Sequence, residues 1–196
     1  MTAPSTPPQP RRPGLLKGLS GKVLLLTVLF VMLGEILIFL PSIANYRLTW
    51  LKGRVAQAEI AALAVEAAPD RMLSHDLKSE LLMGAGVLVV SLKKGDSRQL
   101  ILRSDTTHMI DASFDLRMVN WPEAIMDALG ALLAGDGRVI SVTDLPPNMS
   151  GDVIDVAMDE APLRAAMLGF TLNILLVSVF LALIVGGLLF LTLNQV

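Results

Sequence analysis

Residues 153–193 read VIDVAMDEAPLRAAMLGFTLNILLVSVFLALIVGGLLFLTL, and the organisation of the chain can be worked out from them. A β-rich run passes through a short acidic segment, closed by Pro162, into a long run that begins at Met167 and contains no charge. A helix rises about 1.5 Å per residue, so this run is long enough to cross a hydrocarbon core of about 30 Å. The stretch predicts a strand that is followed, after only a few linking residues, by a transmembrane helix at 165–193.

A second apolar run predicts another transmembrane helix at 23–43, in which Glu35 is the one ionisable residue. The preceding tail, 1–22, is rich in proline, carries four basic and no acidic residues, and is predicted to be disordered and cytoplasmic. A cleaved signal peptide is the competing interpretation, but the run exceeds a normal signal h-region and no A-x-A-like site follows. The mean hydropathy of +0.62 also favours a membrane protein.

Between the two spans, residues 44–164 are predicted to form an extracytoplasmic α+β domain. The first helix should continue outward to about Ala68, because apolar residues recur there every three or four positions, with Arg47 and Glu59 mostly on other faces. Ser74 is a plausible N-cap for a short helix, and Pro122 opens another. Strands are expected at 87–92, 99–103, 113–117, 138–143 and 153–158. We expect a small antiparallel sheet with helices against one face.

Five polar residues in and after the first β-rich region are the candidates for ligand binding: Arg103, Asp105, His108, Asp115 and Arg117. A cavity in a small domain needs a few convergent polar groups, and an arginine can bind a carboxylate through two hydrogen bonds. The alternative interpretation is that these side chains only solvate a loop. Both interpretations stay open.

Glu35 is unusual because a carboxylate within a bilayer is costly unless it is paired or neutralised. One hypothesis is a hydrogen bond to Asn173 of the second span, or to a second Glu35 across a dimer. The alternative is a protonated or partly hydrated side chain. Interhelical polar contacts in lipid typically contribute only about 0.6 kcal/mol, so neither interpretation is preferred.

Several function classes find no support in the residues. The chain has no cysteine and no common nucleotide-binding or hydrolase motif, and its basic residues form no stripe typical of nucleic-acid binders. His75 and His108 lack metal-ligand spacing, so we predict neither a metal site nor a cofactor. Tyr46 and Trp50 are expected to anchor the chain at the membrane interface, and Trp121 to be partly buried in the core.

Four segments carry a likeness to a known family: 26–33, LTVLFVML; 41–47, PSIANYR, with Trp50 and Leu51; 66–70, EAAPD; and 159–164, DEAPLR, with Met167 and Asn173. Together they resemble the N-terminal sensor region of certain alphaproteobacterial membrane histidine kinases, over nearly all of the chain from about Gly18. The resemblance implies an inner-membrane homodimer with cytoplasmic termini. Its periplasmic PAS-like or Cache-like domain would control a cytoplasmic kinase through the second transmembrane helix.

The resemblance therefore predicts a sensor and signal-transmission module without catalytic residues of its own. The HAMP-type linker, phosphoacceptor helix and ATP-binding domain of the family, and through them a response regulator, would follow residues 194–196, so the sequence is expected to be a sensor fragment or a truncated protein. A non-catalytic two-pass accessory subunit of a membrane complex is the alternative. A periplasmic enzyme is disfavoured, because no nucleophile and base pair is recognisable.

Overall fold

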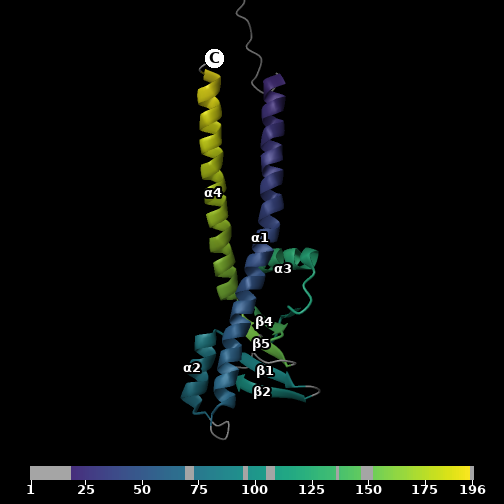
Figure 1. The fold of residues 1–196 in the computed structure, drawn as a ribbon, viewed down its shortest axis with the longest axis vertical. Coiled ribbons are helices and arrows are strands. Elements are labelled where there is room, and N and C mark those ends of the chain that lie inside the picture. The colour runs from purple at the N-terminus through teal and green to yellow at the C-terminus, as the bar shows by residue number, and fades with distance from the viewer. Residues whose placement is uncertain are drawn as a thin grey trace, which may run out of the picture. The chain divides into compact units, whose positions relative to one another are not determined.

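The computed structural model describes residues 19–68, 73–94, 97–104, 109–135, 137–146 and 152–194. The chain divides into two units, residues 1–38 and residues 39–196. The first unit contains the N-terminal part of helix α1. The second contains the rest of α1, the sheet and the other helices (Figure 1). The predicted disordered tail lies mostly outside the described residues.

Helix α1 runs from Leu19 to Glu66, so the first apolar helix does continue outward and ends close to the predicted position. In the second unit one face of α1 is buried in the core. That face comprises Ile43, Ala44, Leu51, Val55, Ala58, Ala61, Ala62 and Val65. Their spacing of mostly three and four residues places them on one side of the helix, as the periodicity predicted.

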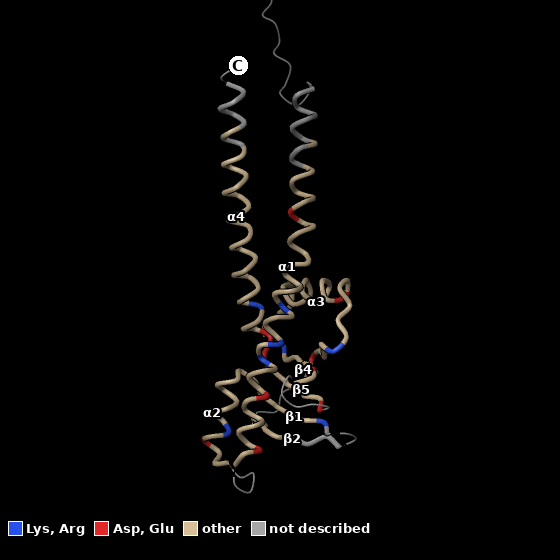
Figure 2. Tube along the Cα trace, viewed as in Figure 1, with Lys and Arg blue, Asp and Glu red and all other residues tan. Residues whose placement is uncertain are grey.

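Helix α4 spans Ala161–Asn194, and it carries no charged residue after Arg164 (Figure 2). By length and composition two helical stretches could cross a membrane: Leu29–Glu66 within α1 and Ala161–Val185 within α4. The ring of Tyr46, a predicted interface anchor, stacks on Phe170 of α4 with the ring centres 4.4 Å apart. This contact ties the two long helices together within the second unit.

The sheet has five strands in the order β2-β1-β5-β4-β3, with bounds β1 Val89–Lys94, β2 Ser97–Arg103, β3 Ala112–Asp115, β4 Val139–Asp144 and β5 Val153–Asp159. The predicted strands are all present, but the prediction of an antiparallel sheet is wrong at one edge. Strand β3 pairs with β4 in parallel, whereas the other three pairings are antiparallel. The helix between β3 and β4 returns the chain to the starting end of the sheet, and such a crossover makes strands parallel.

One face of the sheet supplies the core. Alternate residues of the three inner strands lie on this face and are buried: Val90, Leu92, Ile140, Val142, Ile154, Val156 and Met158. They join the buried face of α1 in one apolar cluster. The outer half of α1 is thereby fixed to the sheet, as the α+β layout requires.

The short helix α2 runs from His75 to Ala85 and begins as predicted, with the Ser74 hydroxyl accepting a hydrogen bond from the Leu77 amide at 3.3 Å. It ends at Gly86, which adopts a left-handed conformation with φ of 66° and donates its N–H to the last turn. A Cβ at Gly86 would also lie 2.6 Å from Nη1 of Arg54 on α1. The positive φ is the reason that glycine is favoured here, while the end of the Arg54 side chain would have to shift to make room for a Cβ.

Replacing Gly86 by alanine should lower the free energy of unfolding by about 1–2 kcal/mol, the cost of a left-handed residue with a Cβ. Gly84→Ala is the matched control, because Gly84 lies inside α2 with open space around it and should gain about 0.5–1 kcal/mol in helix propensity. Urea unfolding followed by tryptophan fluorescence would measure both. Equal effects of the two changes would contradict the prediction.

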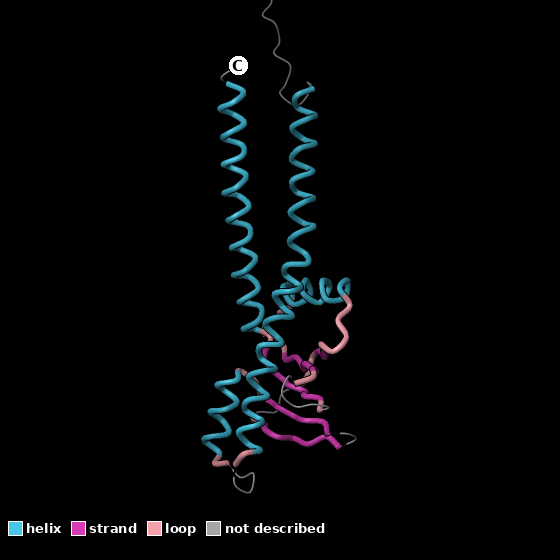
Figure 3. Tube along the Cα trace, viewed as in Figure 1, coloured by secondary structure: helices cyan, strands magenta, loops and turns pink. Residues whose placement is uncertain are grey.

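Helix α3 spans Trp121–Leu133 and connects β3 to β4 (Figure 3). It begins with Pro122 in its first turn, as predicted. In Figure 1 it runs across the direction of α4. Trp121 was expected in the core, but its side chain is 53% exposed, because the face that packs inward consists of the small residues Ala124, Ala128 and Ala131.

Candidate functional site

The most unusual side chain in the described domain is Arg47 of α1, which is only 1% exposed. It lies among apolar core residues, four positions after Ile43 and four before Leu51, which are both buried. Removing a guanidinium from water costs several kcal/mol unless other groups compensate. The surroundings of Arg47 are therefore the first place to look for a functional arrangement.

Two groups compensate part of this cost. The Nη1 atom of Arg47 lies 3.9 Å from Oδ2 of Asp127 on α3, an ion pair beyond hydrogen-bond length. The guanidinium also lies over the ring of Phe114 on β3, with Cζ 4.1 Å from the ring centre. A desolvated cation over an aromatic face contributes about 2 kcal/mol. Arg47 of α1 thus contacts both β3 and α3.

A second ion pair lies beside it, at the start of α4. Glu160 is 2% exposed, and its Oε2 accepts a hydrogen bond from Nη1 of Arg138 at 3.0 Å. Glu160 is the single residue between β5 and α4, and its amide donates to the Arg138 carbonyl. The negative charges of Asp127 and Glu160 stabilise the Arg47 guanidinium, while Arg138 opposes it. We call Arg47, Asp127, Arg138 and Glu160 the junction cluster.

The junction cluster contains two positive and two negative side chains, but not all of their polar atoms are hydrogen-bonded. Among the side chains of the described residues, Nε and Nη2 of Arg47 and Oε1 of Glu160 are buried without a hydrogen-bond partner. Nε and Nη2 form the edge of a guanidinium that can hold a carboxylate through two parallel hydrogen bonds. A donor edge and an acceptor oxygen thus remain free on two oppositely charged side chains that interact electrostatically.

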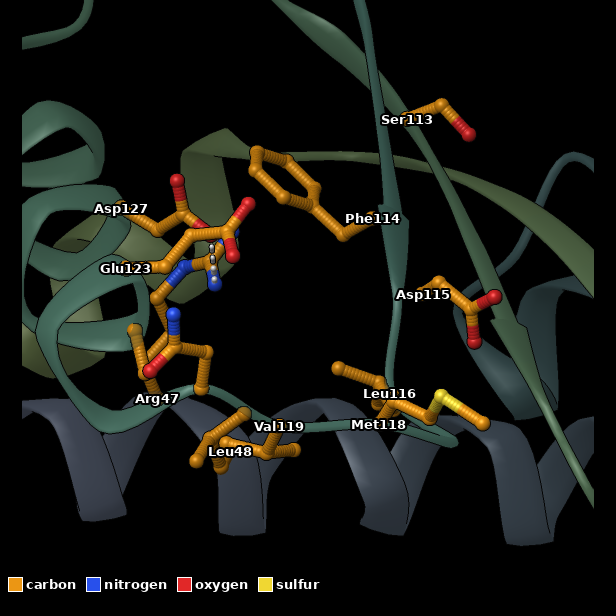
Figure 4. A pocket seen from close by; sticks show the side chains of 12 residues that line it. Arg47, Leu48, Ser113, Phe114, Asp115, Leu116, Met118, Val119, Glu123 and Asp127 are labelled. Carbon is orange, nitrogen blue, oxygen red and sulfur yellow. Dashed lines mark ion pairs between the residues drawn. The ribbon is translucent and has the colours of Figure 1, made fainter.

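A cavity of about 320 Å³ lies next to the cluster, between α3 and β3. Figure 4 shows Glu123 and Asp127 of α3 on one side, with Phe114 and Asp115 of β3 on the other. Arg47, Leu48 and Asn120 also line it. The volume matches the lower end of small-molecule sites, which usually have mostly apolar walls and a few polar groups.

Asp115 on the cavity wall is held by Arg117, whose Nε donates to its Oδ1 at 2.9 Å. Side-chain and backbone hydrogen bonds from Arg117 lower the pKa of Asp115 to about 2. A carboxyl with a lowered pKa contributes stability above its unfolded pKa near 4, and that contribution is lost as the pH falls towards 2. Both side chains are exposed, and Figure 4 shows the Asp115 carboxylate pointing away from Glu123 and Asp127, so the pair contributes little to the stability of the fold.

Arg117→Gln should raise the pKa of Asp115 towards the ordinary aspartate value, because the donating guanidinium is lost. Carboxyl ¹³C chemical shifts followed against pH would measure it directly. The unfolding transition should move little, since exposed ion pairs contribute about 0–1 kcal/mol. An unchanged Asp115 titration in the variant would contradict the pairing.

The structure separates the predicted ligand-binding residues. Asp115 and Arg117 lie together at the β3 edge, whereas Arg103 lies on β2 at the opposite edge of the sheet. Asp105 and His108 lie outside the described residues. Ligand binding at these residues stays a prediction.

The contact of Glu35 with Asn173 stays a prediction. Glu35 belongs to the first unit and Asn173 to the second, and both side chains are exposed. Trp50 stacks with the guanidinium of Arg54, 4.7 Å from Cζ to the ring centre, which adds a protein contact to its predicted interface role.

Sequence reasoning missed the junction cluster. It placed Arg47 and Glu59 mostly off the apolar face of α1, yet both are buried at 1% exposure. The available signal was position: Arg47 occupies the same helical stripe as Ile43, Leu51 and Val55. A charge in such a stripe indicates a buried ion pair rather than a solvated face.

Among the described residues no cluster of three His, Asp or Glu side chains could hold a metal ion. The junction cluster pairs no nucleophile with a base. What distinguishes it is a buried donor edge on Arg47 and a buried acceptor oxygen on Glu160 that have no hydrogen-bond partner within the described part of the chain. Comparisons of the chain with protein-family models, with characterised proteins and with solved structures found no match.

Proposed function

We propose that the chain is the sensor and signal-transmission module of a membrane histidine kinase, passing a periplasmic stimulus through α4 to a cytoplasmic kinase region. The carrying observation is the junction cluster, in which buried Arg47 of α1 interacts with Glu160 at the start of α4. The PAS-like or Cache-like identity of the domain, its periplasmic location, the membrane-spanning helices and the homodimer belong to this proposal.

The connectivity supports transmission. β5 lies in the middle of the sheet and ends at Asp159, and α4 begins at Ala161. Leu163 and Met167, in the first two turns of α4, are fully buried against the core. No flexible linker separates β5 from α4, so a displacement of β5 would move the start of α4 directly.

Two pairings of the cluster supply the two states that signalling requires. In the first, Arg47 lies near Asp127 while Glu160 binds Arg138. In the second, the free edge of Arg47 binds Glu160 and releases Asp127. Exchange of partners in a buried ion cluster biases neighbouring helices between discrete arrangements, because packed cores do not deform continuously.

The cavity gives a stimulus access to this exchange. Asp127 lines the cavity and is the observed partner of Arg47. A cationic or hydrogen-bonding group that bound Asp127 or Glu123 would compete with Arg47 and favour its pairing with Glu160. The stimulus would act by binding one pairing more tightly than the other. The difference between the two affinities limits how far the populations of the two pairings can shift.

Autophosphorylation of the full-length gene product in membrane vesicles, measured with labelled ATP, tests the proposal. We expect ATP-dependent labelling whose rate changes severalfold in Arg47→Met, because methionine fills a similar apolar volume without the charge. Lys52→Met is the matched control, since it removes an exposed cation from the same helix, away from the cavity lining, and should leave the rate unchanged. Thermal unfolding of each variant would verify that the domain is folded.

Each failure has its own meaning. Absence of labelling would overturn the kinase assignment, and a stable one-to-one association with another membrane complex would then favour the accessory-subunit alternative. Labelling that is equal in Arg47→Met and the unaltered protein would overturn the role of the junction cluster.

A further inference from the structure

Helix α3 exposes an apolar face that no described part of the chain covers. Met126 is 69% exposed and Leu133 is still more exposed, and Leu129 between them is half-buried. Their spacing of three and four residues places them on one side of the helix. Trp121, at the start of α3, is exposed as well.

The charges of α3 lie on a different side. Its two charged residues, Glu123 and Asp127, are four apart and line the cavity towards β3 (Figure 4). The inward face consists of small alanines. The helix therefore has an acidic edge directed at its own domain and an apolar edge directed away from it, which is the polarity of a helix that lies at an interface.

The position of α3 identifies what the apolar edge meets. The C-terminal turn of α3 is held to α4 by Arg164, whose Nε donates to the Leu132 carbonyl at 3.4 Å. The charge-free run of α4 begins at Met167, less than one helical turn later. Since α3 runs across the direction of α4 in Figure 1, a bilayer entered by α4 at this level would have its surface alongside α3.

We propose that α3 is an interfacial membrane helix, inserting Met126, Leu129 and Leu133 into the headgroup and acyl boundary of the bilayer. This inference rests on the membrane-spanning part of the proposed function. Trp121 at the start of the helix suits the same boundary, where tryptophan is enriched. The apolar edge carries no basic residue, so the attachment depends on apolar area rather than on anionic lipid.

The absence of cysteine from the chain permits a clean labelling test. An environment-sensitive fluorophore would be attached to Met126→Cys in the full chain, reconstituted in phosphatidylcholine nanodiscs with or without spin-labelled lipid. Met83→Cys on α2 is the matched control, because Met83 has a similar exposure of 76% but lies on another helix of the domain. A label at Leu176→Cys reports separately on whether α4 is in the bilayer.

We expect strong quenching of the Met126 label by spin-labelled lipid and little by aqueous iodide, with the reverse for Met83. A Met126 label as open to iodide as the Met83 label would overturn the proposal. Protection from iodide without quenching by lipid would also overturn it, in favour of coverage by a second copy of the chain. If the Leu176 label is not quenched by lipid, the membrane-spanning part of the proposed function fails instead.

Discussion

Glu160→Ala should lower the free energy of unfolding by about 3 kcal/mol, the lower end of the range for removing one partner of a buried ion pair. The lower end applies because Arg138 is 30% exposed and can be rehydrated. The loss also removes one of the two negative charges that stabilise the buried Arg47 guanidinium, leaving that of Asp127. Equilibrium unfolding in urea, followed by the fluorescence of Trp50 and Trp121, would measure the change.

Two further variants isolate the cause. Glu160→Gln keeps an oxygen that can accept from Arg138 and should cost less than alanine. Glu123→Ala removes an exposed glutamate and should change stability by less than about 0.5 kcal/mol. The start of α4 stays capped in all of them, because the Ala161 amide donates to Asp159. Equal costs for Glu160→Ala and Glu123→Ala would refute the assignment of Glu160 to a buried pair.

Ile154→Ala should lower the free energy of unfolding by about 2–5 kcal/mol, because the substitution leaves a cavity in the packed core. Ile154 is fully buried on β5, where it lies between Leu92 of β1 and Asp144 of β4 in the ladder. A cavity there would loosen the central strand that leads into α4. The same unfolding measurement applies.

Ile60→Ala is the control for this substitution. Ile60 lies on α1 and is largely exposed, so its replacement removes little buried surface and gains some helix propensity. The midpoint of unfolding should therefore stay constant or rise slightly. A loss in Ile60→Ala similar to that in Ile154→Ala would show that the two positions are not distinguished by burial.

Local patterns were sufficient to predict the elements of the fold. The Ser74 N-cap begins α2 as predicted, and the predicted strands at 87–92 and 153–158 correspond to β1 and β5. These features depend only on residues that are close in sequence. The direction of β3 depends instead on the crossover through α3, because a short strand can pair in either direction.

The candidate site was less predictable, for a related reason. The role of Arg47 depends on Phe114, Asp127 and Glu160, which are brought together only by tertiary packing. The sequence analysis selected polar residues in a β-rich region, and of these Asp115 does line the cavity. The acidic start of α4 was recognised, but the burial of Glu160 could not be inferred, because it depends on tertiary packing around its pair with Arg138.

The single-residue link between β5 and α4 also sets the rotation of α4 about its own axis relative to the sheet. Each residue added to a helix turns everything beyond it by about 100° and advances it by about 1.5 Å. One residue inserted between Asp159 and Ala161 would therefore present a different side of α4 to its neighbours along its whole length. Hairpin loops of this domain can change length without such an effect, whereas this link must keep its length for α4 to keep its orientation relative to β5.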